Sequence, residues 1–533
     1  MFKMKKLITL NLLLMISITI LPQSWKTYPY APAGSLLSFP ADEGRHSSEP
    51  IEWWYTSGHL TGITTGKHYS YMLSYFYSPL SIFDGFRILN LSDDDLGLFY
   101  AETKALNYNI MASDSLNIKA KIFSGGTETW HNKTDILGNS LPFEYEISAV
   151  SSSGAINLEY DALKPPLILA DSGYFYEGAT DYTYYYSQTK NEVTGTITLN
   201  GITENVSGSS WIDRQYGTFN PWNGQEYEWF CIQLSNGMDI NITNLFTVKD
   251  EIPDNLKYRL LSAYVDETTQ YTTSDFQIVR LKYSYMPDRV RCYSQKWRIT
   301  SSILNVDIIV STLHSDCEVS LPFRFYEGST NVTGTVNGVN VTGVGFVELL
   351  HSYENPDISI TDTTNLGDVS SLLTWKLNNP DDGNPLKYDL EYSIDSLKTF
   401  LPIITNVADT FYYWNTQALS EGKNIWLKVT GSSIDSTLNN ISVKKLKSNL
   451  TAVTETEYQE HIIIYPNPSP GQFIVEGENI RKIEIIDIIG RTVYSSLINQ
   501  TRQSIDLSTQ QRGIYFVEVT TNRGTTISKL ILE

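Results

Sequence analysis

Cysteine and long apolar stretches are scarce in this chain. Its 533 residues contain three cysteines, Cys231, Cys292 and Cys317, and this odd number excludes a framework of disulfide bonds. Beyond residue 21, no stretch is apolar and long enough to cross a membrane as a helix. We therefore expect no disulfide scaffold and, once the N-terminal segment is removed, no transmembrane segment.

Positive charge and helical periodicity are scarce as well. The 39 Lys and Arg face 59 Asp and Glu, which gives a formal net charge of −20, and no basic run offsets it. Such a chain repels nucleic-acid phosphates and anionic bilayers, so no nucleic-acid partner is expected. The 35 Tyr, 20 Phe and 11 Trp favour strands. We predict an all-β protein of roughly three to four domains.

The N-terminus has the pattern of an export signal. Lys3, Lys5 and Lys6 precede an apolar stretch at residues 7–21, a charged region followed by a hydrophobic region of signal-peptide length. A membrane anchor is the alternative, but the stretch is short for a spanning helix. We predict a signal peptide at residues 1–24 and an exported mature chain.

Residues 28–354 read as many short alternating strands and contain an internal repeat. Three elements recur in the same order: Phe-Tyr-Glu-Gly at 175–178 and 325–328, Val-Thr-Gly-Thr-(Ile/Val) at 193–197 and 332–336, and an aromatic-x-acid ending at Trp211/Asp213 and Phe346/Glu348. Strands rich in Thr and Gly resemble one another easily, but three matches in order favour two copies of one fold. We predict two barrel-like β units, at residues 25–218 and 219–355.

The rest of the chain divides by composition. Residues 356–447 alternate as in a small two-sheet sandwich and resemble fibronectin type III or related Ig-like modules. Residues 448–461 are polar and are interpreted as a linker. Residues 462–533, which contain Tyr-Pro-Asn-Pro at 465–468 and end in Lys-Leu-Ile-Leu-Glu, resemble a type IX secretion sorting domain. That resemblance implies a small C-terminal β-sandwich, the type IX machinery as a partner, and a secreted or cell-surface location.

Three aromatic motifs carry the candidate chemistry. The first motif is Glu52-Trp53-Trp54-Tyr55, and the second is a strand with Tyr182, Tyr184 and Tyr186 on one face. The third is the stretch 208–217, in which Trp211 and Asp213 share a face and Arg214 follows Asp213. A carboxyl group among Trp and Tyr rings is poorly solvated. Its acid form is therefore favoured, as a general acid near neutral pH requires.

These motifs, with Trp297-Arg298 and the Phe346-Val-Glu348 ending, resemble the carotenoid 1,2-hydratase and AttH-like proteins over residues 28–354. The resemblance implies two tandem lipocalin-like barrels that hold an apolar substrate at their junction. It implies Asp213 as the proton donor to an isolated alkene, with Trp211 and Tyr186 lining the pocket and stabilising a carbocation. The chain departs from the family at Tyr184, where hydratases tend to have His, and at Gln215, where many relatives have Glu.

We therefore predict Asp213 as the catalytic residue. The predicted ligand-binding residues are Trp211, Tyr184, Tyr186, Trp53, Trp54, Tyr55, Glu52, Arg214 and Glu348. Structural alternatives stay open: the Glu-Trp-Trp-Tyr motif suits barrel core and rim, and Asp213 with Arg214 suits a pair that closes the strand end. The matching positions of Asp213 and Glu348 also fit an acid that the fold itself demands.

The sequence is consistent with three functions. The first is binding of an apolar or amphipathic small molecule with acid-catalysed hydration, isomerisation or cyclisation, without an organic cofactor. The second is a non-catalytic lipid or pigment carrier, and the third a surface glycan-binding protein. His46, His59 and His68 lack metal-ligand spacing, so they are expected to be surface or hydrogen-bonded residues and no metal is predicted. The absence of Gly-x-Ser-x-Gly leaves a serine hydrolase unsupported.

The cysteines allow one further prediction. Residues 291–299 and 305–312 read as the arms of a hairpin in which facing residue numbers sum to about 606. Cys292 and Cys317 fall close to that register, so we predict a disulfide between them. Cys231 is then left as a buried thiol.

Overall fold

A computed structural model describes residues 24–109, 111–220, 223–321, 323–361, 365–366, 369–417, 419, 424–448, 462–522 and 524–533. The predicted signal peptide, apart from Ser24, and residues 449–461 of the predicted linker lie outside them. The described chain is built of strands, with one 3-10 helix, η1 (Ala41–Glu43), which confirms the all-β prediction. No helix in the described ranges is long and apolar enough to cross a membrane.

The first sheet closes into a barrel. Ten strands follow the ring β1-β2-β3-β4-β5-β6-β7-β8-β11-β12, and β8 completes it by pairing with both β7 and β11. Their bounds are β1 Ile51–Gly62, β2 His68–Leu80, β3 Phe83–Asp93, β4 Leu98–Tyr108, β5 Asn117–Ile122, β6 Thr127–Thr134, β7 Ser140–Val150, β8 Gly154–Ala162, β11 Asp181–Leu199 and β12 Ile202–Gly217. The short β9 (Leu167–Ile168) and β10 (Tyr174–Glu177) pair with the first part of β11.

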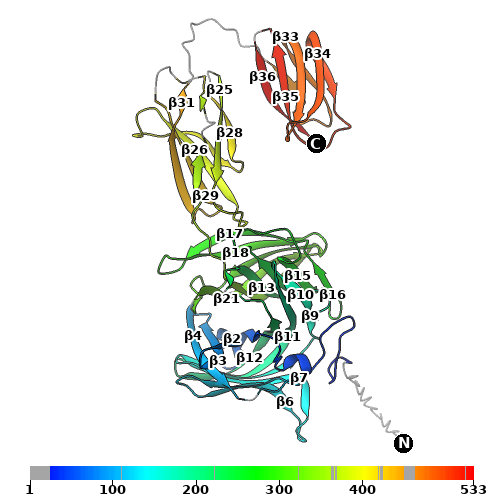
Figure 1. Ribbon diagram of the computed structural model, residues 1–533, viewed down its shortest axis with the longest axis vertical. Helices are drawn as coiled ribbons and strands as arrows, with labels where there is room; N and C mark the ends of the chain where they lie inside the picture. The colour runs from blue at the N-terminus through cyan, green and yellow to red at the C-terminus, as the bar shows by residue number, and fades with distance from the viewer. Residues whose placement is uncertain are drawn as a thin grey trace, which may run out of the picture. The chain divides into compact units, whose positions relative to one another are not determined.

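The second sheet stays open and forms a half-barrel. Its order is β16-β15-β14-β13-β22-β21-β19-β18-β17, with β20 paired to β21, and no pairing joins the described end strands β16 and β17. The bounds are β13 Tyr227–Leu234, β14 Asp239–Leu245, β15 Arg259–Tyr264, β16 Gln270–Thr273, β17 Gln277–Tyr285, β18 Cys292–Ser301, β19 Val306–Thr312, β20 Glu318–Ser320, β21 Arg324–Val336 and β22 Val339–Leu349. Figure 1 shows this sheet in green beside the first barrel.

Two of the three repeated elements correspond to one hairpin used twice. The Phe-Tyr-Glu-Gly element does not, because Glu177 ends β10, which pairs with β11, whereas Glu327 lies within β21. Val193 faces Gly208 across β11 and β12, and Val332 faces Gly343 across β21 and β22. The central glycines of the repeat, Gly195 and Gly334, both have positive φ, +144° and +157°. A Cβ on either would lie 2.1 or 2.3 Å from a backbone oxygen of the adjacent strand, so both copies require glycine for the same close approach.

Each sheet has its own core, and both sheets bury their opposite faces as well. Large aromatics such as Trp54, Trp130 and Tyr160 fill the interior of the first barrel. Phe230, Ile232 and Trp297 belong to the core of the second sheet. A third cluster, which includes Tyr55, Trp211, Trp229 and Phe346, joins the outer wall of the first barrel to the outer face of the second sheet. The junction between the sheets, and not a barrel interior, is therefore where space for a ligand arises.

Two smaller β regions follow. The strands β23 (Ile358–Ile360), β24 (Asn365–Leu366), β25 (Ser370–Leu377), β26 (Leu386–Ser393), β27 (Leu401–Val407), β28 (Phe411–Asn415), β29 (Trp426–Ser433), β30 (Asn439–Lys445) and β31 (Lys447–Ser448) form small sheets around one shared core. The C-terminal unit contains β32 (Ile463–Tyr465), β33 (Gln472–Asp487), β34 (Thr492–Asp506), β35 (Gly513–Thr521) and β36 (Thr525–Leu532) around a core of its own.

The predicted hairpin is present, but the predicted disulfide is wrong. Trp297 pairs with Val310, one residue from the predicted register. Cys292 and Cys317 are nevertheless both free. The second arm ends at Thr312, and Cys317 packs into the core of the second sheet, whereas Cys292 contacts a separate cluster around Tyr353. Cys231 is a buried free thiol, as predicted.

Candidate functional site

A cavity lies between the outer wall of the first barrel and the second sheet. It holds about 940 Å³ of space not filled by protein, solvent at its mouth included. Aromatic and aliphatic side chains from both sheets form most of its wall, among them Trp53, Tyr55, Phe76, Phe86, Trp229 and Phe325. Its described lining contains three carboxyl groups, Glu177, Asp213 and Glu348, and no Lys, Arg or His. Such a wall favours a neutral, largely apolar ligand.

Asp213 is held in this wall by hydrogen bonds from residues on β11 and β12. It lies on β12 between Tyr55 of β1 and Ser187 of β11. Its Oδ1 accepts hydrogen bonds from Trp211 Nε1 at 2.7 Å and from the Ser187 hydroxyl at 2.5 Å. Its Oδ2 accepts one from the Tyr185 hydroxyl at 2.5 Å. Since Oδ1 already has two donors, the proton of the neutral acid belongs on Oδ2.

Burial favours that neutral acid. Loss of hydration raises the pKa of Asp213 from 3.8 to about 7, although the hydrogen bonds from Ser187, Tyr185 and Trp211 oppose the rise. Asn241, on β14 of the second sheet, donates to both the Tyr185 and Ser187 hydroxyls, at 3.2 and 3.3 Å. Asp213 can therefore exist in both protonation states near neutral pH, which is the property a general acid needs.

A pair of acids, Glu327 and Glu348, faces the same junction from the second sheet. Glu327 and Glu348 are directly opposite each other on β21 and β22. The hydroxyl of Tyr55 donates to Glu327 at 2.9 Å, and that of Tyr227 donates to Glu348 at 2.5 Å. Burial raises the pKa of Glu348 to about 7, and burial together with the neighbouring Glu348 raises that of Glu327 well above its usual range. The pair therefore carries at least one proton at neutral pH.

Glu177 is the fourth buried acid at the junction between the two sheets. Its carboxylate accepts a hydrogen bond from the side-chain amide of Gln215 at 2.8 Å, and burial raises its pKa to about 8. The repeated motifs thus supply all four acids: Glu177 and Glu327 come from the two Phe-Tyr-Glu-Gly copies, and Asp213 and Glu348 from the two strand endings. Asp213, Glu327 and Glu348 lie on the two hairpins, and Glu177 lies on β10, which pairs with β11.

Three polar groups in the cavity wall have no hydrogen-bond partner among the described residues. They are the indole N–H of Trp229 and the hydroxyls of Ser74 and Thr243. Buried polar groups are normally hydrogen-bonded, because an unpaired one costs about 1–3 kcal/mol. A ligand with oxygen atoms in a mainly apolar framework would satisfy them.

The structure brings four of the sequence-predicted site residues to the cavity wall: Asp213, Trp53, Tyr55 and Glu348. Trp211 lies directly behind Asp213 and donates to it. Tyr184 and Tyr186 lie on the other face of β11. Tyr186 packs edge-on against Phe39, and Tyr184 stacks on Tyr216. The expected placement of Tyr186 in the pocket is thus wrong, because β11 turns Tyr185 toward Asp213 and its neighbours away.

Glu52, Trp54 and Arg214 lie inside the first barrel. Arg214 is 1% exposed, ion-pairs with Glu52, and places its guanidinium carbon 4.0 Å from the centre of the Trp54 ring. Glu228 and Arg280 form a matching buried pair in the second sheet. These pairs neutralise charge within the cores and do not reach the cavity.

Sequence reasoning missed Tyr185, Glu177, Glu327 and Trp229. The repeated Phe-Tyr-Glu-Gly element marked both glutamates, and Glu-Trp at 228–229 repeats Glu-Trp at 52–53. The three histidines behave as expected: His46 contacts Asp42, His59 the Gly345 carbonyl, and His68 Asp95.

Two protein families match separate regions of this chain. The AttH-like family matches residues 30–353, and the secretion system C-terminal sorting domain matches residues 463–533. Kievitone hydratase of Fusarium solani subsp. phaseoli is 24% identical over 319 residues, which cover 56% of this chain and 82% of that protein. The crystal structure of a putative AttH from Nitrosomonas europaea superposes with a TM-score of 0.51 at 19% identity, covering 61% of this chain and 99% of that one.

These matches indicate how the protein is secreted and which family it belongs to. The sorting domain indicates type IX secretion to the cell surface or exterior. The family match spans more than half of the chain and includes both sheets and the whole cavity. The chain therefore belongs to the AttH-like family.

Proposed function

We propose that this protein is a secreted hydratase-like enzyme that binds an apolar or amphipathic small molecule between its two sheets. In this proposal Asp213 protonates an alkene of the ligand. The observation that carries it is the buried Asp213 carboxyl, which lies in an aromatic cavity wall with a pKa of about 7. The named relative is a hydratase, which supports addition of water over the other acid-catalysed outcomes, isomerisation and cyclisation.

The reaction can be written with the groups at hand. The proton on Asp213 Oδ2 passes to one alkene carbon, and the neighbouring carbon becomes a cation. The faces of Tyr55, Trp53 and Trp229 stabilise that cation. A water molecule adds to it and loses a proton to an ionised carboxylate, for which Glu348 is the candidate. The product is an alcohol, and the proton is later returned to Asp213.

A non-catalytic carrier is the second candidate, and one observation favours it. Both oxygens of Asp213 are already hydrogen-bonded, to Trp211, Ser187 and Tyr185, as in a carboxylate that only holds a junction together. In that case the cavity would bind the same class of ligand without changing it. Asp213 would then affect stability and not turnover.

The first experiment identifies a ligand. The full chain is purified, native mass spectrometry detects any bound molecule, and solvent extraction recovers it. In parallel the protein is incubated with kievitone, because a relative of this chain is named for its hydration. Turnover is scored as the mass gain of one water molecule.

The second experiment tests Asp213. The Asp213→Asn variant should bind ligand with nearly unchanged affinity and lose turnover by roughly 10²–10⁴-fold, the contribution of a general acid. Glu192→Gln is the matched control, since Glu192 is exposed on β11, the strand beside Asp213. Full turnover in Asp213→Asn would reject the acid role, and binding without turnover in the unsubstituted protein would favour the carrier.

A further inference from the structure

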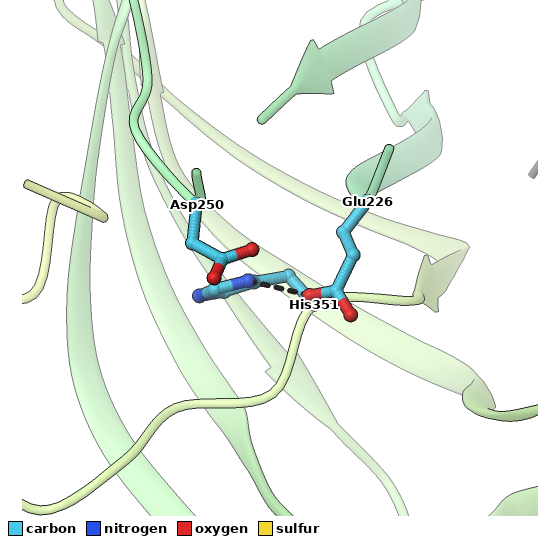
Figure 2. A group of neighbouring side chains, drawn as sticks. All are labelled: Glu226, Asp250 and His351. Carbon is cyan, nitrogen blue, oxygen red and sulfur yellow. Dashed lines mark hydrogen bonds and ion pairs between the residues drawn. The ribbon is translucent and has the colours of Figure 1, made fainter. Parts of the chain in front are cut away.

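A separate cluster of metal-ligating side chains lies at one edge of the second sheet. Glu226 directly precedes β13, Asp250 lies in the turn after β14, and His351 follows β22 by two residues. Because β13 lies between β14 and β22 in the sheet, their ends meet at this edge. One potential ligand atom from each residue lies within 4.8 Å of the other two. Figure 2 shows the three side chains turned toward one another.

The backbone holds this cluster in place. The amide of Phe246 donates to the carbonyl of Glu226 at 2.9 Å, and the amide of His351 donates to the carbonyl of Tyr227 at 3.3 Å. The imidazole of His351 stacks on the Phe246 ring, with the ring centres 3.9 Å apart, and is 3% exposed. The rigid imidazole and the sheet therefore fix the positions of the donor atoms before any ion arrives, as a metal site requires.

The hydrogen bonding of the cluster is incomplete. His351 Nδ1 lies 2.8 Å from Glu226 Oε2, but its Nε2 has no hydrogen-bond partner among the described residues. The nearest acceptor, Asp382 Oδ2, is 3.6 Å from Nε2, too far for a hydrogen bond. The carboxylate of Asp250 accepts no hydrogen bond and forms no ion pair with any described side chain, although it faces Glu226.

The local charge balance is negative. Glu226, Asp250 and Asp382 lie around a single imidazole, that of His351.

We propose that Glu226, Asp250 and His351 Nδ1 form a binding site for a first-row divalent cation of the zinc or manganese type. One imidazole nitrogen with two carboxylates suits zinc or manganese better than calcium or magnesium, which prefer oxygen ligands alone. Asp382 would accept the remaining N–H of the ring, the arrangement that commonly orients a metal-bound histidine. Since Asp382 lies between β25 and β26, the ion would also stiffen the contact between the second sheet and the module that follows.

Calorimetry tests the site on the full chain after treatment with a chelator. Zn²⁺ and Mn²⁺ are titrated separately, with Ca²⁺ and Mg²⁺ as comparison ions. We expect one Zn²⁺ per chain. An imidazole that binds a metal ion gives up any proton on the coordinating nitrogen, and titration in buffers of different ionisation enthalpy measures that release. An absence of Zn²⁺ and Mn²⁺ binding would overturn the proposal, and the cluster would then be a hydrogen-bonded network around His351.

Variants locate the binding. Asp250→Asn should abolish or strongly weaken Zn²⁺ binding, because it replaces one of the two carboxylate ligands. Asp382→Asn should weaken binding by roughly 10–100-fold, as loss of an orienting carboxylate does. Glu251→Gln is the matched control, because Glu251 is the exposed neighbour of Asp250 and should bind as the unsubstituted chain does. Equal affinity in Asp250→Asn and Glu251→Gln would place the ion elsewhere and refute the site.

Discussion

The buried carboxyl of Glu177 should make the junction between the sheets less stable at alkaline pH. Glu177 is 2% exposed, and its one side-chain hydrogen bond comes from Gln215. Burial raises its pKa from 4.5 to about 8, so the folded chain holds this proton more tightly than the unfolded chain does. The corresponding stability is fully present below pH 4.5, falls as the pH rises, and is lost above about pH 8.

The magnitude follows from the same values. The interval from 4.5 to about 8, at roughly 1.4 kcal/mol per pH unit, corresponds to about 5 kcal/mol at most. Water that enters the cavity and hydrates the carboxylate lowers this figure. Glu177→Gln removes the charge but keeps an oxygen that accepts the Gln215 hydrogen bond. The variant should therefore match the unsubstituted chain in acid and exceed its stability by several kcal/mol on the alkaline side of pH 8.

Thermal unfolding followed by tryptophan fluorescence measures the effect. For a unit of more than 300 residues the midpoint shifts by about 1.5 °C per kcal/mol, so the midpoint of Glu177→Gln should rise by about 5 °C in alkali and hardly change in acid. Glu192→Gln, at an exposed position on β11, keeps Glu177 and should therefore follow the unsubstituted chain in both acid and alkali. A midpoint for Glu177→Gln that stays within 1 °C of the unsubstituted chain on both sides would refute a neutral buried carboxyl at this position.

Three further predictions concern the cores, the repeat and export. Glu52→Gln leaves Arg214 buried without its counter-charge and should lower the free energy of unfolding by roughly 3–5 kcal/mol, measured by urea denaturation. Gly195→Ala should destabilise the first barrel, because its Cβ would lie 2.1 Å from the Asn157 carbonyl oxygen, whereas Gly126→Ala, with open space around that position, should be tolerated in the same thermal assay. Removal of residues 462–533 should leave the protein in the periplasm, as fractionation followed by immunoblotting would show, and its normal appearance outside the cell would contradict the sorting role.

Local sequence patterns determined the class of the fold and part of the site. Strand alternation and aromatic content predicted the all-β chain, and the tail carried its own sorting signature. The two-residue period placed Trp211 and Asp213 on one face, which the 2.7 Å hydrogen bond between them confirms. The repeat predicted two copies of one fold, and Gly195 and Gly334 occupy the same kind of positive-φ position in the corresponding hairpins.

Tertiary structure decided which strand face meets the cavity. A strand with both faces buried carries apolar and aromatic residues on each, so alternation alone does not distinguish Tyr185 from Tyr184 and Tyr186. The same ambiguity placed Glu52 and Arg214 in the predicted site, although they neutralise each other inside the barrel. Whether the second sheet closes also depended on pairing between its distant end strands.

The sequence also did not predict which side chains, distant along the chain, lie next to one another in the folded protein. Asp213, Glu327 and Glu348 come together because two hairpins pack against each other through their outer faces, and β10 adds Glu177 beside them. No short motif encodes these contacts. Likewise Glu226, Asp250 and His351 lie together because the strand order brings the ends of β13, β14 and β22 to one side of the second sheet. The sequence by itself determined local periodicity and residue chemistry, since these depend on near neighbours. Only the tertiary structure decided which charges share a buried volume, and hence which carboxyl groups hold their protons at neutral pH.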